Sequence, residues 1–128
     1  MIENFAVEII SPDKTFMKTD ASEVVIPSYE GEIGILRDHI PLITFLRPGL
    51  IKIVNNDEKK FFVEEGTVEF ANNNLLILSS SLKNLKDLDK KTLESIVSDT
   101  KNKLNKENVT DKDRYLLSYK LETLENLN

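Results

Sequence analysis

Up to about Ser81, apolar and polar residues alternate along the chain in short runs, as they do in half-buried β-strands. The runs are rich in β-branched and aromatic residues, and turn-forming Pro, Gly, Asn and Asp residues separate them. They comprise residues 5–10, 23–26, 32–36, 42–46, 50–54, 60–63, 67–70 and 75–78. This many short strands at such spacing predict an antiparallel β-sandwich or barrel.

Beyond Asp87 the period of the pattern changes to that of an α-helix. Apolar residues and one threonine recur at every third or fourth position, at Leu93, Ile96, Val97, Thr100 and Leu104. Asp87 or Asp89 is suited to cap the start of this helix, because a carboxylate there accepts a hydrogen bond from an unpaired backbone amide. We expect a first helix of about 16 residues, roughly 24 Å long.

A second helical stretch follows a short connection at 106–109. Thr110 and Asp113 resemble a capping box, with Asp in the place usually taken by Glu. Leucines then recur on one face at Leu117, Leu121 and Leu124. We expect the two helices to pair antiparallel through their apolar stripes. The predicted architecture is a β-sandwich or barrel in residues 1–86, followed by a two-helix hairpin in residues 87–128.

The predicted hairpin has little apolar surface left to hold it on the sandwich, because each helix is apolar on one narrow face. Asn102, Asn105 and Asn108 also lower the helical propensity near the connection. We therefore expect the hairpin to be the less stable half of the chain. Detachment and permanent docking are the two alternatives, and hydrogen exchange would separate them.

Composition and charge narrow the class of function. The chain has 128 residues, of which 40% are hydrophobic and 30% charged, as in soluble globular proteins. Cysteine is absent, which excludes disulfides, thiolate metal sites and a cysteine nucleophile. The net charge of −5 argues against nucleic acid as the main ligand. No apolar run approaches the ~20 residues that a membrane span requires, so membrane association is expected to run through a protein partner.

The single histidine, His39, lies near Glu30, Glu32 and Asp38 in the sequence, so a metal or acid–base site has to be considered. A catalytic zinc site usually takes three protein ligands that include two or three histidines, which this chain does not supply. Neither a Gly-x-Ser-x-Gly elbow nor a phosphate-cradling glycine loop occurs. The residues alone predict a non-catalytic, partner-binding protein without metal or cofactor. A small metal-dependent enzyme and a generic adaptor are the alternatives.

One longer motif lies in the segment 26–49. It contains Glu-Gly-Glu, an apolar residue and Gly at 30–34, His-x-Pro-Leu at 39–42 and Pro-Gly at 48–49. This pattern resembles the signature of the epsilon subunits of F-type, rotary ATP synthases. Further segments resemble that family's first strand and turn, its last strand and the entry to its helices, at 7–13, 75–78 and 88–89. The resemblance covers essentially the whole chain.

The resemblance implies a role in a rotary machine. In this family the sandwich binds the gamma subunit and the ring of c subunits, and turns with both as part of the central stalk that couples proton transport to ATP synthesis. The hairpin of many members extends into the catalytic head and restrains ATP hydrolysis. A bacterial protein at the cytoplasmic face of the plasma membrane is expected, since the start, 1–4, lacks a leader pattern and the composition is rich in Asn and Lys.

The resemblance also points to particular residues. The family's glutamate and histidine that match Glu32 and His39 lie where the sandwich meets the polar loops of the c ring. We therefore expect both side chains to project from one end of the sandwich as ring contacts. The rest of the docking loop would be formed by Glu30, Gly31, Gly34 and Pro41. The two glycines would permit tight backbone geometry, and the proline would stiffen entry to the next strand.

One motif departs from the family. In members that bind ATP, the first helix opens with an apolar residue, Asp, two variable residues and then Arg-Ala. Leu88 and Asp89 match this opening, but Thr92 stands where the arginine belongs. Leu93 likewise replaces the alanine. Because a triphosphate needs convergent cations and threonine supplies none, we expect weak or no ATP binding and a modest restraint of hydrolysis.

Overall fold

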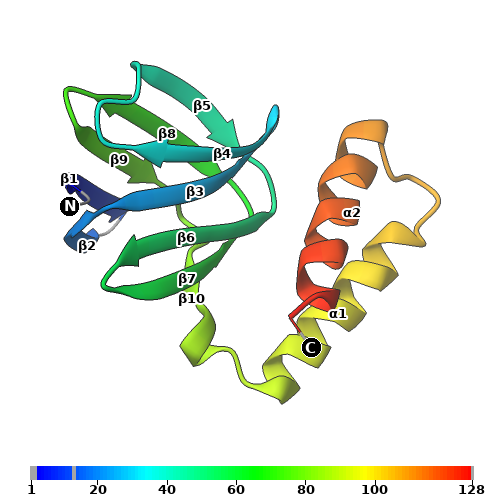
Figure 1. Cartoon of the computed structure of the whole chain (residues 1–128). Helices are drawn as coiled ribbons and strands as arrows, with labels where there is room; N and C mark the ends of the chain where they lie inside the picture. Colours follow the sequence, from blue (N-terminus) through cyan, green and yellow to red (C-terminus); the bar gives the residue numbers. More distant parts are fainter. Residues whose placement is uncertain (1–2, 13, 128) are drawn as a thin grey trace.

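A computed structural model of the chain describes residues 3–12 and 14–127 and shows a β-sandwich beside a helical hairpin (Figure 1). The predictions at residues 1, 2, 13 and 128 lie outside this description. The strands are β1 (Phe5–Ser11), β2 (Lys14–Ala21), β3 (Glu23–Ser28), β4 (Gly31–Leu36), β5 (Leu42–Leu46), β6 (Gly49–Asn55), β7 (Asp57–Val63), β8 (Gly66–Ala71), β9 (Asn74–Leu78) and β10 (Lys83–Asn84). A 3-10 turn, η1 (Leu85–Asp87), leads to α1 (Lys90–Leu104) and α2 (Asp111–Glu125).

The described strands form one sheet that curls into two layers. Their order is β10-β7-β6-β3-β5-β8-β9-β1-β2, with β4 paired to β3. The layers join where Ser28 of β3 pairs with Leu46 of β5. Neighbouring strands are antiparallel except β1 and β9, which run parallel. The predicted sandwich followed by two helices is confirmed.

The core of the sandwich follows from the period-2 pattern. In β1, for example, Phe5, Val7 and Ile9 are buried while the residues between them are more exposed. The same alternation in the other strands brings sixteen buried side chains into one cluster between the layers. Removing this much apolar surface from water is the main force that holds the sandwich together.

Strand β2 is missing from the prediction because its sequence alternates weakly. Phe16 and Met17 are adjacent, and the rest of the strand is polar or small. Met17, Thr19 and Ala21 occupy the more buried positions. Among the described strands β2 pairs with β1 alone and forms an edge of the sheet, where charged residues such as Lys18 are common.

The helix caps lie where the sequence places them. Asp89, rather than Asp87, caps α1, and its Oδ1 accepts a hydrogen bond from the Thr92 amide at 2.7 Å. Thr110 caps α2, with its Oγ1 accepting from the Asp113 amide at 3.1 Å. Both bonds satisfy amides that have no partner within the helix, so they fix where each helix begins.

The hairpin packs on the sandwich through a second apolar cluster. Phe62 of β7, Leu93 of α1 and Leu124 of α2 are buried together, with Leu50 and Leu85 packed against them. Three buried side chains thus hold the hairpin, compared with sixteen in the main core. Phe62 is available for this contact because β7 is buried on both faces at its end, so that Phe62 points toward the helices while its neighbours fill the core.

Candidate functional site

The candidates for function in this chain are features of its surface. In residues 3–12 and 14–127, no three metal-ligating side chains gather in one place. No helix in the same residues is long and apolar enough to cross a membrane. The features that remain are the loop around His39, the turn around Glu32, an exposed apolar face and the junction with the hairpin.

The His39 loop is fixed by local contacts. His39 Nδ1 lies 2.7 Å from the Ile40 carbonyl oxygen, and its ring meets the edge of Phe70 at 5.9 Å. Asp38 has a φ of 67°, and its amide donates to Asn73 Oδ1 at 2.6 Å. These bonds tie the loop to the turn between β8 and β9. The connection between β4 and β5, to which His39 belongs, lies at the end of the sandwich that is remote from the hairpin (Figure 1).

Glu32 lies at the other end of β4. Its exposed side chain lines a cavity of about 270 Å³ together with Arg47, Tyr119 and Glu122, at the seam between sandwich and hairpin. The expectation that Glu32 and His39 project from one end of the sandwich is therefore wrong. The cause is the direction of β4, which starts beside the hairpin and carries the chain away from it before the His39 loop begins.

The turn between β3 and β4 carries the Glu-Gly-Glu sequence. Ser28 Oγ donates to the Gly31 carbonyl at 2.7 Å and accepts from the Glu30 amide at 3.1 Å. Gly31 has a φ of +119°, which residues with a Cβ rarely adopt, so glycine is needed here. Gly34 has no such need, because an added Cβ would meet only the Glu23 carboxylate at 3.8 Å. Pro41 is exposed and precedes β5 directly.

An apolar strip covers the outer face of the layer β5-β8-β9-β1 and reaches the adjacent turn between β3 and β4. We define it as Ile10, Tyr29, Ile43, Phe45 and Leu78. Ile43 and Phe45 are 77% and 61% exposed. The strand register aligns Phe45, Leu78 and Ile10 in one row, with Thr67 of β8 between the first two. A groove of about 580 Å³ runs along this row.

The apolar strip is absent from the features predicted above, although the sequence carries a signal for it. The run 42–46 has four apolar residues and the run 75–78 is wholly apolar, so both strands carry apolar side chains on two faces. One face fills the core, and the other must face a partner or water. A contiguous exposed apolar surface of this kind is typical of an interaction site.

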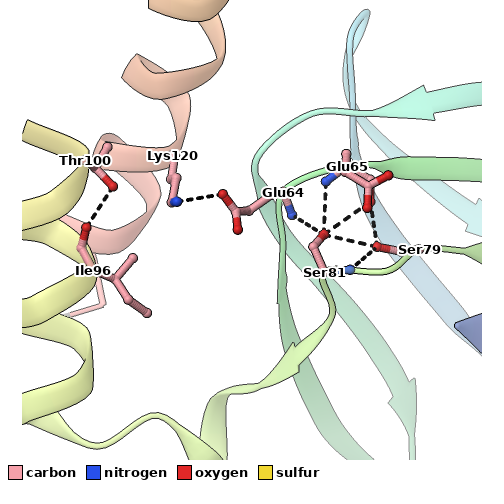
Figure 2. Close-up of polar contacts among 7 residues, drawn as sticks. All are labelled: Glu64, Glu65, Ser79, Ser81, Ile96, Thr100 and Lys120. Carbon is pink, nitrogen blue, oxygen red and sulfur yellow. Dashed lines mark hydrogen bonds and ion pairs between the residues drawn. The ribbon is translucent and has the colours of Figure 1, made fainter. Parts of the chain in front are cut away.

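Polar and aromatic contacts from α2 complete the junction with the hairpin. The Arg47 guanidinium lies over the Tyr119 ring, 3.9 Å from its centroid, and Tyr29 stacks on Tyr115. Lys120 Nζ lies 2.6 Å from Glu64 Oε1 (Figure 2). The Lys120 side chain is only 13% exposed, so this ion pair is less screened than a surface pair.

The turn that presents Glu64 is itself braced. Ser81 Oγ accepts hydrogen bonds from the amides of Glu64 and Glu65, at 3.0 and 3.2 Å (Figure 2). Ser79 Oγ donates to the Glu65 carbonyl at 2.6 Å. The serines that follow β9 therefore position the acidic partner of Lys120, in addition to ending the strand.

Leu88, Asp89, Thr92 and Leu93, which we call the degenerate nucleotide motif, have structural roles in this chain. Leu93 is buried in the second apolar cluster and Leu88 packs against it. The Asp89 carboxylate caps α1, and the hydrogen bond from the Thr92 amide lowers the pKa of Asp89 below its ordinary value. None of these four residues offers a cation to a phosphate.

Calorimetric titration of the purified chain with Mg-ATP is expected to show no binding tighter than about 1 mM. The physical reason is the lack of convergent guanidinium groups, since Arg47 already covers Tyr119. The Thr92→Arg variant is titrated alongside it, because this substitution restores one guanidinium group, which can donate two parallel hydrogen bonds to a phosphate. Sub-millimolar binding by the unaltered chain would contradict this expectation.

Comparisons with known proteins agree with this architecture. Residues 4–84 match the family described as ATP synthase, Delta/Epsilon chain, beta-sandwich domain. The chain is 45% identical to the ATP synthase epsilon chain of Pelagibacter ubique, with 100% of both chains covered. It is 30% identical to ATP synthase epsilon chain 2 of Nitrobacter hamburgensis, with 84% of this chain and 79% of the relative covered.

Two solved structures share the fold. One, from the central stalk and c ring of the Tetrahymena thermophila mitochondrial ATP synthase, matches with a TM-score of 0.65 at 18% identity, over 98% of this chain and 96% of that chain. The other, from the Euglena gracilis mitochondrial ATP synthase, has a TM-score of 0.76 at 18% identity, over 97% and 79%. At this identity the likeness concerns the arrangement of strands and helices.

Proposed function

This chain belongs to the ATP synthase epsilon chain family, and on that premise we propose that it is a rotor subunit of the central stalk, joining the gamma subunit to the ring of c subunits. As an epsilon subunit it is non-catalytic. Its task is to transmit torque, which requires a stiff body and two contact surfaces rather than a pocket. The sandwich, with its continuous buried core, supplies the stiff body.

The apolar strip is the proposed contact for the gamma subunit. The observation that carries this proposal is the exposure of Ile43 and Phe45, two large apolar side chains on neighbouring outward-facing positions of β5. Large apolar and aromatic side chains form the centre of stable protein interfaces, because their burial releases water and leaves no polar group unpaired.

The turn between β3 and β4 is the proposed contact for the c ring. Glu30 and Glu32 are exposed there, on a backbone held by Ser28. Carboxylates at this position complement basic loops of a ring, which sets the register of the contact more than its affinity. His39 lies at the opposite end of β4 and holds its own loop, so we propose the ring contact at Glu32 without it.

Reversing the charge at Glu32 is expected to impair coupling. In membrane vesicles that carry the assembled synthase, Glu32→Lys should lower ATP-driven proton pumping while ATP hydrolysis continues, because a lysine would repel the basic ring loops. Glu58→Lys is the matched control, since Glu58 is an exposed carboxylate of β7. Pumping by Glu32→Lys at the level of Glu58→Lys would remove Glu32 from the ring contact.

The hairpin is the proposed regulatory part of the subunit. When extended it would reach the catalytic head, and with its degenerate nucleotide motif it would restrain hydrolysis only modestly. Through its partners the chain would lie at the cytoplasmic face of a bacterial plasma membrane.

A pull-down with purified gamma and ring subunits tests the whole proposal. Capture of both subunits by the chain is expected. Failure to capture either would favour the alternative of an adaptor for another assembly.

A further inference from the structure

The apolar strip and the hairpin meet at Tyr29. This side chain lines the groove beside Phe45 and Leu78, and its ring also stacks on Tyr115 of α2, with centroids 6.0 Å apart and planes 11° apart. Tyr115 is not among the described residues that line the groove. We infer that docking of the hairpin and binding of a partner to the apolar strip are coupled through Tyr29, so that each favours the other.

The backbone of Tyr29 is held independently of the hairpin. Its amide donates to the Phe45 carbonyl at 3.3 Å, which places the residue beside the strip. The bonds of Ser28 to Glu30 and Gly31 then fix the turn that follows. Tyr29 is 41% exposed, and within residues 3–12 and 14–127 its ring is held by the groove wall and by Tyr115 alone. An exposed aromatic ring exchanges rotamers quickly unless a neighbour holds it, and the neighbour here is Tyr115.

Tyr115 takes this position only as part of the docked α2 helix. Its ring meets Tyr119 edge to face at 4.8 Å, and Tyr119 lies under the Arg47 guanidinium. The Arg47 amide donates to the Pro27 carbonyl at 3.0 Å, which ties the cation to the same corner of the sandwich. The chain of contacts therefore runs from the sandwich through α2 and back to Tyr29.

The consequence for binding follows from preorganisation. With the hairpin docked, the Tyr29 wall of the groove is already ordered, and a partner does not have to immobilise it on binding. By thermodynamic reciprocity a bound partner must then also stabilise the docked hairpin. This inference rests on the proposed function, in which the gamma subunit occupies the strip. A subunit whose hairpin has been released would hold the stalk less tightly.

The test is titration of the full chain with purified gamma subunit, compared with the variants Tyr115→Ala and Tyr115→Phe. We expect Tyr115→Ala to bind about threefold to tenfold more weakly, in line with the loss of one aromatic pair. Tyr115→Phe keeps the ring and should bind as the unaltered chain does. Hydrogen exchange should show that gamma slows exchange in α2 in the unaltered chain and in Tyr115→Phe, but less in Tyr115→Ala.

The outcomes are distinguishable. If the unaltered chain fails to bind gamma, the proposed function fails. If it binds, but Tyr115→Ala binds equally well with the same protection of α2, the coupling is overturned. In a Tyr29→Ala background, Tyr115→Ala should cause no further loss of affinity, because it acts through Tyr29. A further loss there would show a direct contact of Tyr115 with gamma and would also overturn the coupling.

Discussion

Replacing Phe45 with lysine is expected to abolish binding of the gamma subunit and to leave the sandwich folded. Phe45 lies in the exposed row of the apolar strip, where truncation to alanine alone should weaken binding about 30-fold or more if the residue is an interface hot spot. Lysine should weaken it further, because a charge would be buried without a partner. The fold should persist, since the side chain points away from the core cluster.

Calorimetry with purified gamma measures the affinity, and a thermal melt reports on the fold. Phe16→Ala is the matched control, because Phe16 is also an exposed phenylalanine but lies on β2, where its ring meets Phe61. We expect its affinity for gamma to be unchanged. Binding of the Phe45→Lys variant at the unaltered affinity would show that gamma does not use the apolar strip.

Leu124→Ala is expected to release the hairpin while the sandwich stays intact. Leu124 is 0% exposed and packs with Phe62 and Leu93, so its truncation should cost about 2–5 kcal/mol. The other contacts of α2 are weaker, since a cation–π pair such as Arg47 on Tyr119 contributes about 0.5–2 kcal/mol. Docking by so few contacts should not survive the loss, whereas the main core lies in a separate cluster.

Hydrogen exchange measures the local stability of the hairpin and of the sandwich separately. Amides of α1 and α2 should exchange much faster in Leu124→Ala, and those of the core strands should be unchanged. Leu36→Ala is the control, because it removes the same atoms from a leucine that is exposed in β4 and should leave no cavity. Helix amides that stay as protected as core strands in Leu124→Ala would mean that the hairpin is permanently docked.

Local chemistry made much of the fold predictable from the sequence. The alternation in β1, the Asp89 and Thr110 caps and the leucine stripe of α2 each depend on residues close together in the chain. Gly31 is needed for its positive φ, as the Glu-Gly-Glu turn suggested. Such features are predictable because backbone sterics and capping act over a few residues.

Features that depend on distant residues were not predictable in this way. Glu32 and His39 are close in sequence, but the direction of β4 separates them, and that direction is set by pairing with β3. Phe61 and Phe62 look alike in the sequence, yet one fills the core and the other meets the hairpin. Both outcomes follow from which strands become neighbours, which a one-dimensional pattern does not specify.

The parallel pairing of β1 with β9 has a consequence for how the protein is made. The pairs run from Ala6 with Asn74 to Ile10 with Leu78, so β1 gains this second neighbour, besides β2, only after most of the sandwich has been synthesised. Strand β2, which pairs with β1, is tied to the same late event. On the ribosome the sheet therefore closes after β9 has left the exit tunnel, and nascent chains interrupted before that point carry a β1–β2 hairpin whose β1 edge is unpaired and open to aggregation.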